Sequence, residues 1–271
     1  MTNIINAKGE KESFSPRKVY QSARRAGASK PQADKIVKEV EKKLYPDKPT
    51  SKIFSEVKSF LNRENPKSGI RFNLKKAMKD LGPTGFPFEK YIKGVFSERG
   101  YKTKVNQNIK GKCLVHEIDF LAEKGGFIYI GECKYRNRPK DRVHSGDALM
   151  NYARFLDIKK GSFLKKEIKS ILVTNTKFTK RSEKYSRCVG VELLGWRWPR
   201  NKGLEYYIES QELYPITILP SFNKRMAEAF SREKKMLAND VLKIDLRKFA
   251  KRYNLPYNRM EKLSEEAKIL L

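Results

Sequence analysis

The sequence predicts an α/β fold in which a sheet is covered by helices, with more helices before and after the sheet. Apolar residues recur at helical spacing over residues 15–64 and 88–99, which is typical of amphipathic helices. Over residues 115–134 the spacing changes to every second residue, as in paired strands. A further helix is expected over 147–158, followed by short apolar strands at 170–174 and 189–194. Strands and helices in this order indicate a sheet with helices packed on it.

The first part of the chain is expected to form a strand or hairpin followed by helices. Ser15 precedes Pro16, and this pair predicts a helix start, because serine caps free N–H groups and proline fits the first turn. The first helix is expected to end at Gly27, a second to span 29–44, and a third to begin at Thr50.

The clearest break between predicted secondary-structure elements is the segment 82–87, Gly-Pro-Thr-Gly-Phe-Pro. It has turn-forming residues in nearly every position. We therefore expect the main domain boundary there. The prediction is a mainly helical domain over 1–82, a sheet-containing domain over 83–215, and a charged helical region over 216–271.

The charge of the chain indicates a polyanionic partner. Its 271 residues contain 60 Lys and Arg against 31 Asp and Glu, a formal net charge of +29, which favours nucleic acid. No apolar run approaches the roughly 20 residues of a membrane-spanning helix, and the first residues lack the apolar core of a signal peptide. We expect a cytoplasmic protein with no membrane partner.

Cysteine and histidine are too scarce for a zinc site. Cys113, Cys133 and Cys188 form no C-x-x-C pair, so they are expected to be free thiols. With only two histidines, any metal must be held mainly by oxygen, which favours Mg²⁺ or Mn²⁺.

Charged side chains cluster in the predicted hairpin. Glu132 and Lys134 are two residues apart, so they share a face of one strand. If residues 123–126 form the turn, Asp119 lies opposite Ile130 and diagonally across from Glu132, at a Cβ separation of roughly 7 Å. Two carboxylates at that spacing can share a cation, and the Lys134 ammonium can stabilise charge building on a phosphate.

The alternative is that these charges lie on a solvated strand face. Ile128 and Ile130 precede Glu132 on the same face, so the charges end a buried strand, where they need partners or a metal. Glu117 shares the face of Asp119 and is a rival second carboxylate.

The residues around the hairpin resemble the Mrr-type restriction endonucleases of the PD-(D/E)XK superfamily. The similarity covers residues 84–210 and is carried by Phe88-Glu89, Gly100-Tyr101, Ile118-Asp119, Gly131-Glu132-Cys133-Lys134-Tyr135, 173–179 and 190–194. It implies a restriction-endonuclease-like mixed sheet flanked by helices. Many Mrr-like proteins have Gln in place of Glu132, and Glu is the acid of the broader superfamily.

The resemblance also implies hydrolysis of phosphodiester bonds in double-stranded DNA. Asp119, Glu132 and the backbone carbonyl of Cys133 would ligate Mg²⁺, and Lys134 would assist the attacking water. Glu89 matches a further acidic position that supports the metal in many relatives.

The first 80 residues resemble an ATP-cone, the nucleotide-binding regulatory module of ribonucleotide reductases. The likeness is carried by 4–5, Gly9, 14–15, 18–19 and 26–27, and Lys8 and Lys18 would contact the phosphates of ATP or dATP. The Lys-Arg pair of that family is replaced by Asn6-Ala7, which predicts weak or absent nucleotide binding. The alternative is a basic helical module for DNA or dimer contacts.

Two features outside the hairpin have competing interpretations. The basic C-terminal helices are expected either to follow a DNA backbone or to be solvated. Trp196 and Trp198 suit base stacking, although packing beside a strand end is favoured.

The function predicted from the sequence is a metal-dependent endodeoxyribonuclease of the restriction or DNA-defence type, acting on double-stranded DNA as a homodimer. The alternatives are a structure-selective nuclease of the Holliday-junction type and a nucleic-acid-binding protein without catalysis. The presence of Asp119, Glu132 and Lys134 together favours the enzyme.

Overall fold

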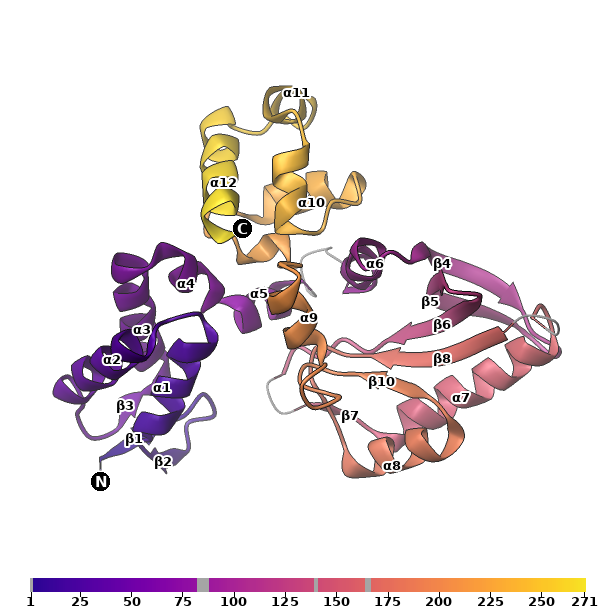
Figure 1. The fold of residues 1–271 in the computed structure, drawn as a ribbon, viewed down its shortest axis with the longest axis horizontal. Coiled ribbons are helices and arrows are strands. Elements are labelled where there is room, and N and C mark those ends of the chain that lie inside the picture. The colour runs from indigo at the N-terminus through magenta and orange to yellow at the C-terminus, as the bar shows by residue number, and fades with distance from the viewer. Residues whose placement is uncertain (1, 82–87, 139–140, 164–166) are drawn as a thin grey trace.

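The centre of the chain forms a five-stranded mixed sheet with helices on both faces (Figure 1). This computed structural model describes residues 2–81, 88–138, 141–163 and 167–271. The expected α/β architecture, a sheet covered by helices, is confirmed.

The sheet has the strand order β10-β8-β6-β5-β4. Strands β4, β5 and β6 are antiparallel neighbours, whereas β6, β8 and β10 run parallel. The strands are β4 (Lys102–Lys110), β5 (Val115–Lys124), β6 (Phe127–Cys133), β8 (Glu167–Val173) and β10 (Glu192–Leu194). The edge strand β4 was not expected, because its alternation is mostly between charged and small polar residues.

Each face of the sheet has its own apolar core. On one face, helix α6 (Phe88–Glu98) packs against Phe120 and Ala122. On the other face, helix α7 (Ser145–Lys160) covers a layer of isoleucines from the four strands β4, β5, β6 and β8. Because β6 is covered on both sides, all its residues after Phe127 are buried.

The hairpin between β5 and β6 is tighter than the sequence suggested. Lys124 pairs with Phe127 and Leu121 with Ile130, so the expected pairing of Asp119 with Ile130 is wrong by two residues. Gly125 and Gly126 have φ angles of +60° and +86°, which allow a two-residue turn that matches the twist of the strands. The shift moves Asp119 closer to Glu132 along the ladder.

The expected strand over 189–194 is also partly wrong. Helix α8 (Lys180–Val189) occupies its first residue, and Gly190 ends that helix in the left-handed conformation with φ +75°. Helix α8 was missed because most of its residues are polar. The short strands β7 (Arg142–Val143) and β9 (Lys177–Phe178) form a separate parallel pair.

The N-terminal unit has its own core, formed by apolar residues between Ile4 and Leu61. Its elements are β1 (Asn3–Ile5), β2 (Lys11–Ser13), α1 (Pro16–Arg25), α2 (Lys30–Lys42), β3 (Lys48–Pro49) and α3 (Thr50–Glu64). Ser15 caps α1 as predicted, and Ser29 caps α2. Helices α4 (Pro66–Arg71) and α5 (Leu74–Asp80) follow, and the boundary expected at 82–87 lies outside the described residues.

The C-terminal helices share a core with the helices that precede the sheet. The elements are α9 (Leu204–Ser210), η1 (Ile216–Ile218), α10 (Lys224–Arg232), η2 (Ala238–Lys243), α11 (Leu246–Arg252) and α12 (Tyr257–Leu270). One apolar cluster runs from α5 and α6 through Ile216 and Phe230 to Leu270. The core therefore continues across residue 215, where a domain boundary was expected. None of the helices in the described part of the chain combines the length and apolarity needed to span a membrane.

Candidate active site

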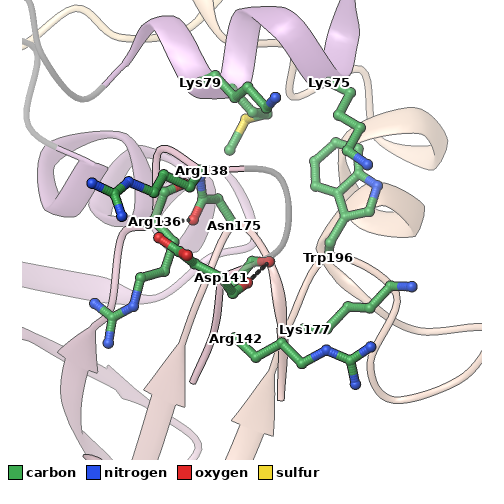
Figure 2. A pocket seen from close by; sticks show the side chains of 11 residues that line it. Lys75, Lys79, Arg136, Arg138, Asp141, Arg142, Asn175, Lys177 and Trp196 are labelled. Carbon is green, nitrogen blue, oxygen red and sulfur yellow. Dashed lines mark hydrogen bonds between the residues drawn. The ribbon is translucent and has the colours of Figure 1, made fainter. Parts of the chain in front are cut away.

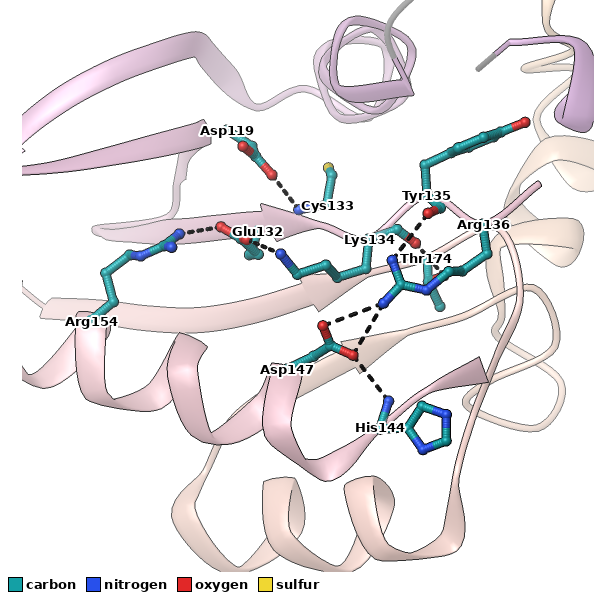
Figure 3. A network of polar contacts seen from close by, with 10 residues as sticks. All are labelled: Asp119, Glu132, Cys133, Lys134, Tyr135, Arg136, His144, Asp147, Arg154 and Thr174. Carbon is teal, nitrogen blue, oxygen red and sulfur yellow. Dashed lines mark hydrogen bonds and ion pairs between the residues drawn. The ribbon is translucent and has the colours of Figure 1, made fainter. Parts of the chain in front are cut away.

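Asp119 lies in β5 beside the end of β6. Its carboxylate accepts a hydrogen bond of 2.6 Å from the backbone N–H of Cys133 (Figure 3). Burial raises the pKa of Asp119 to about 6, and the neighbouring charges of Glu132 and Glu89 add to the rise. Burial and nearby negative charge disfavour the ionised form of Asp119, and a cation beside the carboxylate would stabilise that form.

Glu132 is almost fully buried near the end of β6, with 6% of its surface exposed. One carboxylate oxygen accepts a hydrogen bond of 2.6 Å from Lys134 Nζ, and the other contacts the guanidinium of Arg154 on α7 (Figure 3). Two cations therefore compensate a carboxylate that would otherwise be costly to bury.

Arg154 was missed by the sequence reasoning. It lies three residues after Asn151 and four before Ile158, which are both buried in α7. This spacing puts all three on the sheet-facing side of the helix, so helical periodicity was the signal that marked Arg154 as a partner of a strand residue.

Cys133 is the point on which the predicted acids converge. Its thiol is buried, and burial raises the pKa of this thiol well above the ordinary value. The charges of Asp119, Glu89 and Glu132 raise it further. Glu89 is half-buried in the first turn of α6. The structure thus brings together three acids that are distant in the sequence.

Residue Glu117, the rival carboxylate, is exposed and pairs with Asn108 of β4. It is not among the groups that shift the pKa of Asp119. Of the two histidines, His116 bonds to Asp157 at 2.8 Å, and His144 precedes α7.

The groups at this strand end that could hold a metal ion are oxygen donors, namely the carboxylates of Asp119 and Glu132 and the backbone carbonyl of Cys133. Among the described residues, no three acidic, histidine or cysteine side chains are arranged as a metal site. The expected ligand set of Asp119, Glu132 and the Cys133 carbonyl needs only two carboxylates, which agrees with Mg²⁺, an ion that keeps several water ligands.

The strand end that carries these groups is held by backbone and side-chain bonds. The Lys134 N–H donates to the Val173 carbonyl at 2.8 Å, and Thr174 Oγ1 donates to the Lys134 carbonyl at 2.6 Å. Just beyond, the guanidinium of Arg136 lies 3.3 Å from Asp147 of α7. These contacts fix the direction in which Lys134 leaves the sheet.

The remaining predicted residues lie away from this centre. Lys8 and Lys18 belong to the N-terminal unit and pair with Glu10 at 3.4 Å and Glu12 at 3.3 Å. Trp196 is 4% exposed and belongs to the main core. Trp198 packs against a smaller cluster, so the packing interpretation is confirmed for both tryptophans.

Comparisons with known proteins identify relatives of unknown function. No family model matches the sequence. The MspJI restriction endonuclease in complex with an oligonucleotide is 17% identical with a TM-score of 0.32, over 48% of this chain and 30% of that one. A TM-score this low does not establish a common fold.

Two other matches are much stronger. A solved structure described as a protein of unknown function, AF1548, has a TM-score of 0.59 and 34% identity over 66% of this chain and 94% of that chain. An uncharacterized protein of Archaeoglobus fulgidus is 40% identical over 150 residues, which are 55% of this chain and 82% of the relative. The chain belongs to the family of this uncharacterized archaeal protein.

Proposed function

We propose that the chain is a metal-dependent endonuclease that hydrolyses phosphodiester bonds in double-stranded DNA. The observation that carries the proposal is the convergence of Asp119, Glu132 and Glu89 on the buried end of β6, with Lys134 in contact with Glu132. Lys134 and Arg154 already compensate Glu132, whereas the pKa of Asp119 is raised by burial and by the neighbouring acids. A bound cation would stabilise the ionised form of Asp119.

The metal would be Mg²⁺ or Mn²⁺, held by Asp119, Glu132 and the Cys133 carbonyl. When bound, such an ion polarises a phosphate oxygen and lowers the pKa of a water ligand. Arg154 contacts the Glu132 carboxylate from the α7 side and orients it. Glu89 adds negative charge from α6.

Lys134 would stabilise the substrate phosphate. Its side chain is 21% exposed and its ammonium lies 2.6 Å from Glu132, so the ammonium is already oriented at the site before substrate arrives. A cation held in place gains more from the extra charge of a phosphorane than a mobile one does, because no reorganisation is needed.

The substrate is inferred from charge. The net charge of +29 favours a polyanion, and a restriction or DNA-defence role implies a double-stranded substrate whose sequence or modification is recognised. A homodimer would provide two active sites, one for each strand of the DNA duplex. A regulatory role for ATP or dATP at Lys8 and Lys18 stays a separate and weaker proposal, because both lysines are ion-paired with neighbouring acids.

The test is cleavage of modified, unmodified and branched DNA with Mg²⁺, with Mn²⁺ and with a chelator. The matched control is Asp119→Asn, which removes the charge of one ligand and keeps its shape. Cleavage by the parent that stops with the chelator and in the control supports the proposal. If the parent cuts no DNA form with either metal, the protein is a nucleic-acid-binding protein instead, and a cut restricted to branched DNA would identify a structure-selective nuclease.

A further inference from the structure

A basic cavity lies immediately beyond the strand end that carries Lys134. It has a volume of about 400 Å³, within the range of sites that hold small ligands. Helix α5 forms one wall, the segment after β6 another, and the segments after β8 and β10 complete it (Figure 2). Arg136, two residues after Lys134, belongs to its lining.

The charges of the cavity are unbalanced. Six basic residues line it against one acid, Asp141; the basic residues are Lys75, Lys79, Arg136, Arg138, Arg142 and Lys177. Arg136 is paired with Asp147, whereas the ammonium groups of Lys75, Lys79 and Lys177 form no ion pair with any residue of the described chain. Partial burial lowers the pKa of Lys75, and the charges of Lys79, Arg197 and Lys177 lower it further. These cations repel one another, and an anion between them would relieve the repulsion.

The neutral polar groups of the cavity are already used by the protein. Asn175 accepts from the N–H of Arg136 at 2.9 Å and donates to its carbonyl at 2.8 Å. Thr176 Oγ1 donates to the carbonyl of Asp141 at 2.7 Å. The walls are therefore tied together, and the lysines remain available to a ligand.

Trp196, which packs in the main core, and Met78 supply the apolar part of the lining, and Figure 2 shows the indole of Trp196 beside Lys75. The indole N–H of Trp196 is buried and has no hydrogen-bond acceptor among the described residues. Phosphate-binding cations beside an aromatic ring are the two features that bind a nucleotide without selecting its base.

The segment that follows β6 connects the cavity to the candidate active site. The Tyr135 hydroxyl donates to the Lys79 carbonyl, and Thr174 donates to the Lys134 carbonyl. The same short segment carries Lys134, which contacts Glu132, and Arg136, which lines the cavity, so the cavity adjoins the candidate active site.

We propose that this cavity binds one nucleotide unit of the DNA strand that enters the active site, with its phosphate among Lys75, Lys79 and Lys177 and its base or sugar beside Trp196. The inference rests on the proposed function, because the bound strand is the substrate of the nuclease. It assigns the cavity the task of positioning the strand, and no bond is made or broken there.

The test compares two triple variants in an Asp119→Asn background, which prevents cleavage. One removes Lys75, Lys79 and Lys177, each replaced by Ala. The charge-matched control replaces three exposed lysines of the N-terminal unit, Lys30, Lys38 and Lys52, by Ala. Affinity for a fluorescein-labelled duplex is measured by anisotropy over a range of salt concentrations.

The cavity variant should bind at least about 10-fold more weakly near physiological salt, and the slope of log affinity against log salt should fall by about 1 to 2, because each lost phosphate contact removes about 0.9. The control should change less than about 3-fold, because its exposed lysines do not line the cavity and lose only general attraction to DNA. Equal affinity of the two variants overturns the proposal. If the triple variant melts earlier than the parent, single Lys→Gln variants replace it.

A second measurement follows the cavity directly. The chain has two tryptophans, so Trp198→Phe leaves Trp196 as the single tryptophan, whose emission is excited selectively over that of tyrosine. Duplex DNA should change its emission, and the change should vanish in the cavity variant. Inorganic phosphate and dAMP serve as separate probes, and saturation by dAMP with unchanged DNA affinity in the cavity variant would assign the cavity to a free nucleotide and overturn the strand assignment. Cleavage by the parent is scored separately, so failure of the nuclease proposal remains distinguishable from failure of this one.

Discussion

Glu132 is held between two cations of different origin. Lys134 comes from the same strand, two residues away, and Arg154 comes from the helix that covers the sheet. One is expected to face the substrate and the other to support the carboxylate from behind, so replacing each should have a different effect.

Replacement of Lys134 by Ala should separate chemistry from binding. Cleavage should fall about 10²- to 10³-fold, because a cation aimed at developing charge is among the larger catalytic contributions, while DNA affinity should change less than about 3-fold in a chain with 60 basic residues. Single-turnover cleavage and anisotropy measure the two quantities. A Lys134→Ala protein that cuts as fast as the parent would falsify the assigned role.

Replacement of Arg154 by Ala should destabilise the fold. It leaves a buried carboxylate with one cation, and we expect a loss of about 1–3 kcal/mol in the free energy of unfolding. The control is Lys159→Ala, which removes an exposed cation from the last turn of the same helix and should change stability by less than about 0.5 kcal/mol. Urea unfolding provides the comparison, and equal midpoints for the two variants would show that Arg154 does not support Glu132.

One side chain of helix α7, Asp157, holds the connection between strands β4 and β5 through hydrogen bonds. Asp157 accepts hydrogen bonds from the N–H groups of Cys113 and Leu114 at 2.9 and 3.2 Å, and from His116 at 2.8 Å. The hydrogen bond with His116 is the main cause that lowers the pKa of Asp157, and the backbone N–H groups add to it.

The stabilising effect of Asp157 should depend on pH. Because its folded pKa is lowered below the ordinary value of 3.8, the stabilisation is complete above that value and is lost as the pH falls below it. The melting temperature of the parent should exceed that of Asp157→Asn at pH 6, and the difference should shrink toward pH 3. A difference that is constant across this range would contradict the role of the ionised carboxylate.

The elements that the sequence predicted are those with a clean apolar period. Helices α1, α2, α3 and α6 and strands β5 and β6 have such a period, and capping residues such as Ser15 mark helix starts. Strand β4 and helix α8 lack it, because charged and small polar residues occupy positions that partly face solvent. The hairpin register was missed because a Gly-Gly pair allows a turn shorter than the flanking charges suggest.

The candidate site was predictable only in part. Local spacing placed Glu132 and Lys134 on one face, but the approach of Glu89 and Arg154 depends on how α6 and α7 pack on opposite faces of the sheet. The periodicity of each helix indicates which of its faces is buried, but it does not indicate which strand residue that face contacts.

For the whole molecule, the charge predicts binding that weakens steeply with salt. If several phosphates are neutralised, the affinity for a random duplex should fall about 10³-fold or more between 50 and 200 mM salt, because released counterions drive association. Anisotropy titrations at four salt concentrations measure the slope. A flat response, or no binding at the lowest salt, would remove nucleic acid as the partner.

The continuous core between α5, α6 and the C-terminal helices bears on where DNA would be cut. Buried Ile216, Phe230 and Leu270 belong to the same cluster as Phe88 and Tyr91, and the Tyr91 hydroxyl donates to the Leu213 carbonyl at 2.8 Å. The C-terminal helices are therefore fixed to the sheet and cannot swing as a tethered arm. If these helices bind the duplex and the candidate active site cleaves it, the distance between the two sites is constant. Every cut would then fall at one fixed number of base pairs from the bound segment.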